Sequence, residues 1–152
     1  MQNLIFRPYT TNDYAEIVPM IMELYNKDGA TTVGAMTIEK IDLTLATLTT
    51  QNNLGDVFIF ELGNIVVGYA IITSFWSNEF GGRVLIIDEL LVKPDLRNQG
   101  ISTKFFNYLF EKRIYNETVY MLEVGVTNKK AAAFYKRLGF KNFKTKHQFR
   151  LA

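Results

Sequence analysis

The apolar residues of the N-terminal third recur every three or four positions, which is the spacing of a helix that buries one face. One such stripe consists of Ile17, Met20, Ile21 and Leu24, and a second consists of Ile38, Ile41, Leu45 and Leu48. Either Thr10 or Thr11 suits the start of the first helix, and Gly29 lies where that helix is expected to end. Thr37 is the expected cap of the second helix, and the polar segment 52–55 marks its end.

Runs of β-branched and aromatic residues predict the strands. The segment from Asn3 to Pro8 has the length of a short edge strand. Val57 to Leu62 and Ile65 to Ser74 are joined by Gly63-Asn64, a pair that favours a tight hairpin turn. Arg83 to Val92 is the next expected strand.

The second half of the chain continues the alternation of helix and strand. A helix that opens at Gly100 is expected to bury a stripe of four residues, which are Ile101, Phe105, Tyr108 and Leu109. Thr118 to Val126 is expected to be a strand, the segment from Asn128 to Gly139 a capped helix, and Phe140 to about Phe149 a final strand. The order of elements is strand, two helices, three strands, helix, strand, helix, strand. This order predicts an α/β fold with a mixed sheet and helices on both faces.

The amino-acid composition limits the domain organisation and the reactions open to the protein. The 152 residues suit a single domain spanning 1–152. The chain has no cysteine, which excludes disulfides, thiolate metal sites and a thioester intermediate on the enzyme. Any group transfer must therefore be direct or use another nucleophile. The lone His147 has no partner in the sequence for metal binding, so no metal site is expected.

Charge and hydropathy bear on partners and location. A formal charge of +2, from 17 basic and 15 acidic side chains, is too balanced to indicate wholesale nucleic-acid binding. The longest apolar run, Ile65 to Ile72, is too short to span a bilayer, and the first residues lack the pattern of a signal peptide. We therefore expect a cytoplasmic protein without nucleic-acid or membrane partners.

The segment from Val92 to Ser102 runs from the end of a strand, through a turn, into the first turn of a helix. Backbone N–H groups at such a helix start have no intrahelical partner and point along the positive end of the helix dipole. The guanidinium of Arg97 adds charged, paired N–H donors, and Gly100, which has no side chain, lets the backbone approach a ligand closely. The pattern predicts a binding site for a phosphate group.

Two motifs connect the chain with a known family. The first motif has Arg or Gln, then any two residues, then Gly, then any one residue, and then Gly or Ala. Here these positions hold Arg97, Gly100 and Ser102, so a serine stands in place of the last small residue. In the second, Asn128 caps a helix and Tyr135 follows seven positions later. Ala131 and the closing Leu138-Gly139-Phe140 complete that register. With both motifs in place, the chain resembles the GNAT-type N-acetyltransferase superfamily, and it is nearest to the diamine and small-amine acetyltransferases.

The resemblance implies a fold and a co-substrate. The fold is a sheet of six or seven mostly antiparallel strands with one splayed parallel pair, and acetyl-coenzyme A (acetyl-CoA) binds where that pair separates. The pantetheine arm is expected along the end of the 83–92 strand, like an added strand, and the diphosphate at the glycine turn. The residues implied to bind the coenzyme are Leu91, Val92, Arg97, Asn98, Gln99, Gly100, Ile101, Ser102, Asn128 and Tyr135.

Acetyl transfer to an amine requires a base, because a lysine-like amine with a pKa of about 10.4 is almost fully protonated at neutral pH. Glu89 is the expected base, acting directly or through a water, with Asp88 in reserve because successive strand residues face opposite ways. A local bulge in the strand would exchange the faces to which Asp88 and Glu89 point. The resemblance implies that Tyr135 returns a proton to the departing thiolate.

These catalytic assignments have alternatives. Asp88 and Glu89 would mark a solvent face in an exposed strand, but apolar residues on either side favour burial and function. Tyr135 lies on an apolar helix stripe, where a core role is the alternative to catalysis. The basic residues between Lys144 and Arg150 fit the solvent-exposed face of a strand better than a surface that binds nucleic acid.

The expected partner is a small-molecule amine, with a polyamine or a related cationic amine as the favoured class. This expectation comes from the segment 75–92, which looks like that of diamine acetyltransferases and places acids and aromatics near the acceptor. The alternatives are an acetyltransferase that acts on a protein or peptide amine, and a non-catalytic acetyl-CoA sensor or partner-binding module on the same fold. Resembling proteins are often dimers, so a homodimer is also expected.

Overall fold

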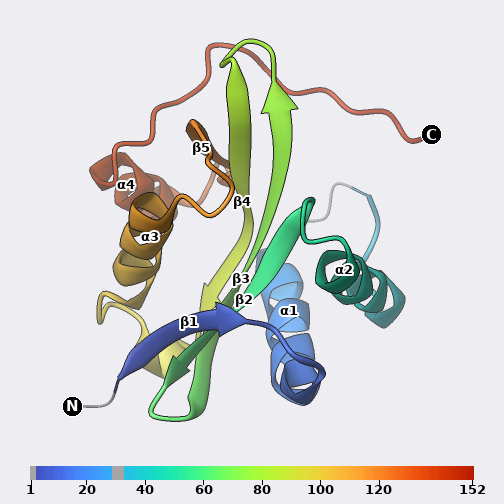
Figure 1. The fold of residues 1–152 in the computed structure, drawn as a ribbon, viewed down its shortest axis with the longest axis vertical. Helices are drawn as coiled ribbons and strands as arrows, with labels where there is room; N and C mark the ends of the chain where they lie inside the picture. Colours follow the sequence, from blue (N-terminus) through green and yellow to red (C-terminus); the bar gives the residue numbers. More distant parts are fainter. Residues whose placement is uncertain (1–2, 29–32) are drawn as a thin grey trace. The chain divides into compact units, whose positions relative to one another are not determined.

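The computed structural model of the chain describes residues 3–28 and 33–152. A five-stranded sheet has the order β1-β2-β3-β4-β5, and only the pair β4 and β5 is parallel. Its strands are β1 (Leu4–Pro8), β2 (Gly55–Leu62), β3 (Ile65–Ser77), β4 (Gly82–Val92) and β5 (Val119–Leu122). The helices are α1 (Tyr14–Asp28), α2 (Ile38–Thr50), α3 (Ile101–Lys112) and α4 (Lys129–Arg137) (Figure 1). The mixed sheet and the order of these elements confirm the predicted fold class.

The chain divides into two compact units, Met1–Leu122 and Glu123–Ala152. The first unit holds the whole sheet with α1, α2 and α3, and the second holds α4 and the C-terminal segment. The single domain expected over 1–152 stays a prediction.

Local sequence signals fix the ends of several elements. Thr10 rather than Thr11 is the cap at the start of the first helical segment, where its N–H donates to the Asp13 carboxylate at 2.8 Å. Thr37 caps α2 as predicted, because its hydroxyl accepts from Lys40 N. Gly63 and Asn64 both have positive φ, at 57° and 66°, which is the geometry of the predicted tight hairpin. The expected end of the first helix at Gly29 lies outside the described residues.

One face of the sheet is covered by α1 and α2. The buried stripes Ile17, Met20, Ile21 and Ile41, Leu45, Leu48 pack with Val57, Ile59, Tyr69, Ile71 and Leu91 from three strands. Leu24 is partly buried against this core and Ile38 is exposed. The helical spacing therefore predicted this core face almost completely.

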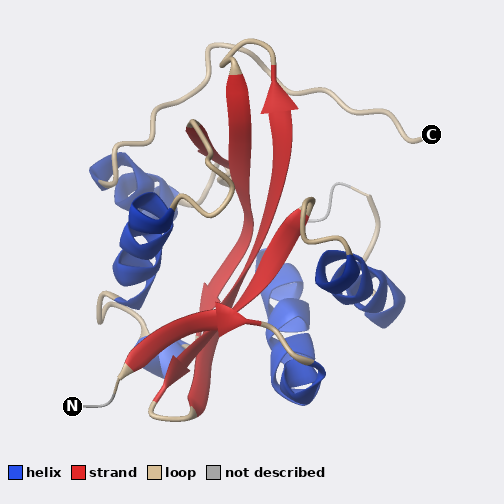
Figure 2. Cartoon of the chain, in the orientation of Figure 1, coloured by secondary structure: helices blue, strands red, loops and turns tan. Residues whose placement is uncertain are grey.

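The opposite face is covered by α3, so helices lie on both faces as predicted (Figure 2). The ring centroid of Phe105 lies 5.2 Å from Phe6, 5.7 Å from Phe58 and 4.6 Å from Phe60. Phe58 and Phe60 alternate with Val57 and Ile59 along β2, and this alternation separates the two cores.

A β-bulge interrupts β4 at Asp88. Ile87 pairs with Ile72 and Glu89 pairs with Ile71, so Asp88 is an extra residue on β4. Residues directly paired across strands share a face, and Ile71 and Ile72 face opposite ways. Ile87 and Glu89 therefore lie on opposite faces, although simple alternation would place them on the same one.

The bulge also explains why β5 is shorter than predicted. The parallel ladder ends at the pair Ile87 and Leu122, immediately before the bulge. Because a bulge bends its strand and disrupts pairing, β4 no longer offers β5 a straight edge beyond this point. The expected strand from Thr118 to Val126 is thus only partly correct, and Val126 is 99% exposed.

The predicted final strand from Phe140 to Phe149 is wrong. Residues 140–152 form neither helix nor strand, and Phe149 is 66% exposed. A strand exists only through hydrogen bonds to a neighbouring strand, and the unit Glu123–Ala152 contains none. The described residues therefore give five strands instead of the six or seven implied by the resemblance.

Candidate active site

The last residues of β4 present a free sheet edge. Beyond Ile87 the described residues place no strand on the side of β4 that faces away from β3. Lys93 N donates to Val67 O on β3 at 2.9 Å, and the Leu91 carbonyl lies against Gly68 of β3. Backbone groups alternate in direction along an antiparallel strand, so Leu90 and Val92 point to the open edge while Leu91 points into the sheet. Of the two predicted pantetheine contacts, only Val92 offers its backbone to a ligand.

The turn that follows β4 is held by short-range bonds. Pro94–Leu96 form one turn of 3₁₀ helix, and Arg97 Nε reaches back to donate to Val92 O at 2.9 Å. Asn98 and Gly100 have positive φ, at 62° and 79°. Arg97 therefore fixes the path from the strand end to the helix start, and its guanidinium lies at the place where the sequence predicted an anion.

The start of α3 has the geometry predicted for an anion site. Gly100 is the N-cap residue, no side chain caps the helix, and the first helical bond runs from Lys104 N to Gly100 O at 2.9 Å. The N–H groups of Ile101, Ser102 and Thr103 thus have no acceptor one turn back. No atom lies within 4 Å of the place where a Cβ on Gly100 would stand, so space for a ligand exists in front of these groups.

Glu89 is a buried carboxylate held by two phenols. Its side chain is 7% exposed and lies on the face covered by α1. Tyr25 Oη of α1 donates to Oε1 at 2.6 Å, and Tyr69 Oη of β3 donates to Oε2 at 2.8 Å. Burial raises the pKa of Glu89 above its usual range, and the two hydrogen bonds oppose that rise.

Asp88 differs from Glu89 in its surroundings. It is the extra residue of the bulge and is exposed, whereas Glu89 is buried. Of the two predicted acids, only Glu89 has the desolvated environment that makes a carboxylate a stronger base.

Sequence reasoning missed Tyr25 and Tyr69 as neighbours of Glu89. A signal for Tyr25 was present, because it follows Ile17 and Ile21 at steps of four and therefore shares their helix stripe. Tyr69 gave no comparable signal, since only the register of β3 against β4 brings it to the carboxylate.

The C-terminal unit contains the other two predicted site residues. Asn128 is the N-cap of α4, where its Oδ1 accepts from Ala131 N at 3.1 Å, and Gly139 follows the helix with φ of 92°. The Tyr135 ring packs 5.2 Å from Phe134 and 5.9 Å from Phe140, centroid to centroid. Burial raises the pKa of Tyr135, so the phenol keeps its proton at neutral pH.

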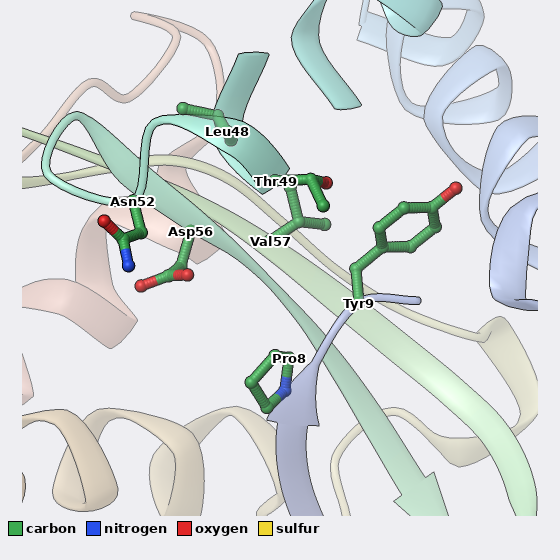
Figure 3. Close-up of a pocket in the computed structure, with 7 residues that line it drawn as sticks. All are labelled: Pro8, Tyr9, Leu48, Thr49, Asn52, Asp56 and Val57. Carbon is green, nitrogen blue, oxygen red and sulfur yellow. The ribbon is translucent and has the colours of Figure 1, made fainter. Parts of the chain in front are cut away.

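A pocket of about 200 Å³ lies at the start of β2 (Figure 3). Its lining consists of Pro8, Tyr9, Leu48, Thr49, Asn52, Asp56 and Val57. The Asp56 carboxylate accepts a short hydrogen bond from the Tyr115 hydroxyl, and burial raises the pKa of Asp56. None of the predicted site residues lines this pocket.

Comparison with known proteins places this geometry in a family. The acetyltransferase (GNAT) family matches residues 19–140, and the chain belongs to this family. None of the helices that the structure describes combines the length and apolar character needed to cross a bilayer.

Two curated relatives match part of the chain. An uncharacterized N-acetyltransferase of Methanocaldococcus jannaschii is 39% identical over 87 residues, which are 55% of this chain and 38% of that protein. A thialysine N-epsilon-acetyltransferase of Mus musculus is 35% identical over 78 residues, which are 51% of this chain and 45% of that protein. The chain thus spans less than half the length of these two relatives.

A solved structure extends the likeness to the whole fold. A possible acetyltransferase from Clostridium difficile 630 has a TM-score of 0.82, with 19% identity, and covers 98% of each chain. At this identity the likeness concerns the fold and does not bear on the substrate.

The environment of Glu89 predicts a pH-dependent difference in stability between the wild type and Glu89→Gln. The folded protein raises the pKa of Glu89 above the ordinary value of 4.5, so the folded state binds the proton more tightly than the unfolded state. The stability contributed by Glu89 is therefore full below pH 4.5 and falls as pH rises through the folded pKa. Thermal melting of both proteins from pH 4 to pH 8 should show the wild type losing stability relative to Glu89→Gln.

Taking the difference between the two proteins removes the titration of the carboxyl groups that do not interact with Glu89. A difference that stays constant, or that changes in the opposite direction, would contradict the raised pKa.

Proposed function

We propose that the protein transfers an acetyl group from acetyl-CoA directly to a primary amine of a small cationic molecule. The observation that carries this proposal is the open edge of β4 from Asp88 to Val92, which leads within one turn to the uncapped start of α3. An extended arm and a diphosphate are joined in coenzyme A in the same order. Membership of the GNAT family supports acetyl-CoA as the co-substrate.

The coenzyme would be held mainly by backbone groups. Val92 N–H, together with Leu90, is available to an arm that adds to the sheet as another strand. The N–H groups from Asn98 to Thr103 would receive the diphosphate, with Gly100 leaving room for close approach. Ser102 has the same backbone N–H as the small residue usual at its position, and its hydroxyl adds a donor.

Glu89 would serve as the base and Tyr135 as the acid. The raised pKa of Glu89 makes the carboxylate a better proton acceptor, and Tyr135 carries a phenol proton at neutral pH that it would supply to the leaving thiolate. The chain has no cysteine, so direct transfer to the amine is the simplest path.

A cationic acceptor is favoured by the charge at the end of β4. Asp88 and Glu89 are adjacent acids, and Tyr25 and Tyr69 surround the second of them. The exposed Trp76 pairs with Arg83, six residues before Glu89, so it lies roughly 20 Å along the strand and is not part of this group. The mouse relative bears the name of an enzyme that acts on an ε-amine, which supports an amine acceptor.

An amine panel tests the function. Release of free thiol from acetyl-CoA should be fastest with spermidine and similar polyamines, and slower with amino acids, aminoglycosides and lysine peptides. Calorimetry with coenzyme A on the same protein separates enzyme from sensor, since both bind but only an enzyme releases thiol. Coenzyme binding without thiol release from any amine would favour the sensor, and a preference for peptides would exclude the small-amine acceptor.

Substitution of Gly100 tests the diphosphate site. Asn and Asp are nearly isosteric and both tolerate a φ of 79°, and a Cβ at this position has open space around it, so the two variants differ mainly by one negative charge. Calorimetry should find coenzyme A bound at least about tenfold more weakly by Gly100→Asp than by Gly100→Asn, because like charges would meet. Equal affinities would place the diphosphate elsewhere.

Tyr135→Phe tests the proton donor. Loss of a positioned acid should lower kcat by about 10² to 10⁴ while the affinity for coenzyme A stays close to that of the wild type. Phe134→Leu is a suitable control, because it alters the same aromatic contact without removing a hydroxyl. An unchanged kcat in Tyr135→Phe would remove this residue from the mechanism.

A further inference from the structure

Both carboxylate oxygens of Glu89 already accept a hydrogen bond. Tyr25 binds one oxygen and Tyr69 binds the other, and the residue is 7% exposed. The hydrogen bond from each phenol therefore offers a path by which a proton from the acceptor can reach Glu89.

The two phenols differ in their access to solvent. Tyr69 is 0% exposed, in the core between β3 and α1, so its hydroxyl leads only to Glu89. Tyr25 lies in the last turn of α1 and is only partly buried. Of the groups bonded to Glu89, Tyr25 is the one with a side open to a ligand.

The direction of its hydrogen bond defines what Tyr25 presents to that ligand. A phenol has one proton and accepts through its lone pairs. Because the Tyr25 proton is directed to Glu89 Oε1, the remaining lone pairs of Oη are acceptors. Such a group suits an N–H donor, and an ammonium group provides the strongest donor among amines.

We propose that Tyr25 binds the acceptor ammonium and relays its proton to Glu89. This inference rests on the proposed function, and it names the residue through which the buried base acts. In the transfer, an N–H bond of the ammonium breaks and its proton joins Tyr25 Oη, while the Tyr25 O–H bond breaks and its proton joins Glu89 Oε1. The ammonium becomes a neutral amine, the carboxylate becomes a carboxylic acid, and Tyr25 is unchanged.

The charged and titratable groups around this pair are few in the described part of the chain. Tyr25 comes from α1, Tyr69 from β3, and Asp88 precedes Glu89 on β4. The residues of α2 in this core are apolar. Burial and the neighbouring Glu89 raise the pKa of both phenols, so both remain neutral at physiological pH, and Tyr25 takes a proton from the ammonium as it gives its own to Glu89.

The two phenols provide a matched pair of variants. Tyr25→Phe and Tyr69→Phe each remove one hydrogen bond to Glu89, but only the first removes the relay. With the amine that the wild type acetylates best, kcat should fall about 100-fold in Tyr25→Phe and less than about tenfold in Tyr69→Phe. The pH profile of kcat should lose the ionisation of Glu89 only in Tyr25→Phe.

A double-mutant cycle with Glu89→Gln adds a second measurement. If Tyr25 and Glu89 act in one relay, Tyr25→Phe should lower kcat only slightly further in a protein that already carries Glu89→Gln. Incorporating 3-fluorotyrosine at position 25 or 69 keeps the side-chain size and the O–H group, so it tests the relay without loss of a fold contact. The rate should change at position 25 and stay near the wild-type value at position 69.

The outcomes separate the relay from the proposed function. Equal losses in the two Phe variants, equal effects of the fluorotyrosines, or additive losses in the cycle would overturn the relay while leaving an active acetyltransferase. Failure of the wild type to acetylate any amine would overturn the proposed function, and the relay with it.

Discussion

A single extra residue in β4 determines how the site is built. The bulge at Asp88 ends the ladder between β4 and β5, and from that point β4 continues with one edge unpaired. The same bulge turns Glu89 to the face covered by α1. One backbone irregularity thus provides both an edge to which an extended ligand can add and a carboxylate buried on the adjoining face.

Burial of Glu89 carries a cost that its neighbours offset. A carboxylate away from water is destabilised unless it receives hydrogen bonds, and Glu89 receives one on each oxygen. The opposing effects leave a base that is stronger than an exposed glutamate and is fixed in one orientation. Of the two phenols, Tyr69 is enclosed and only Tyr25 is partly exposed.

The residues predicted for the site belong to two compact units of the chain. The β4 edge, the start of α3 and Glu89 belong to Met1–Leu122, whereas Asn128 and Tyr135 belong to Glu123–Ala152. Within the second unit the cap of α4 is fully formed, and aromatic packing restrains Tyr135.

The sequence by itself determined the elements whose signals are local. Helical spacing identified α1 and α2 with their buried faces, Gly63-Asn64 identified the hairpin, and the glycine at position 100 identified the start of α3. Each of these depends on residues within one or two turns of one another, so the chain specifies them before any distant contact forms.

Only the tertiary structure decided the features that depend on a distant partner. The segment after Phe140 has the alternation of a strand but pairs with no strand among the described residues, and alternation alone does not make a strand without a partner. The face of Glu89 and its bonds to Tyr25 and Tyr69 follow from the register of β3 against β4 and from the packing of α1. Register is a relation between segments far apart in the chain, so the residue types pointed to Glu89 but not to the two phenols that bind it.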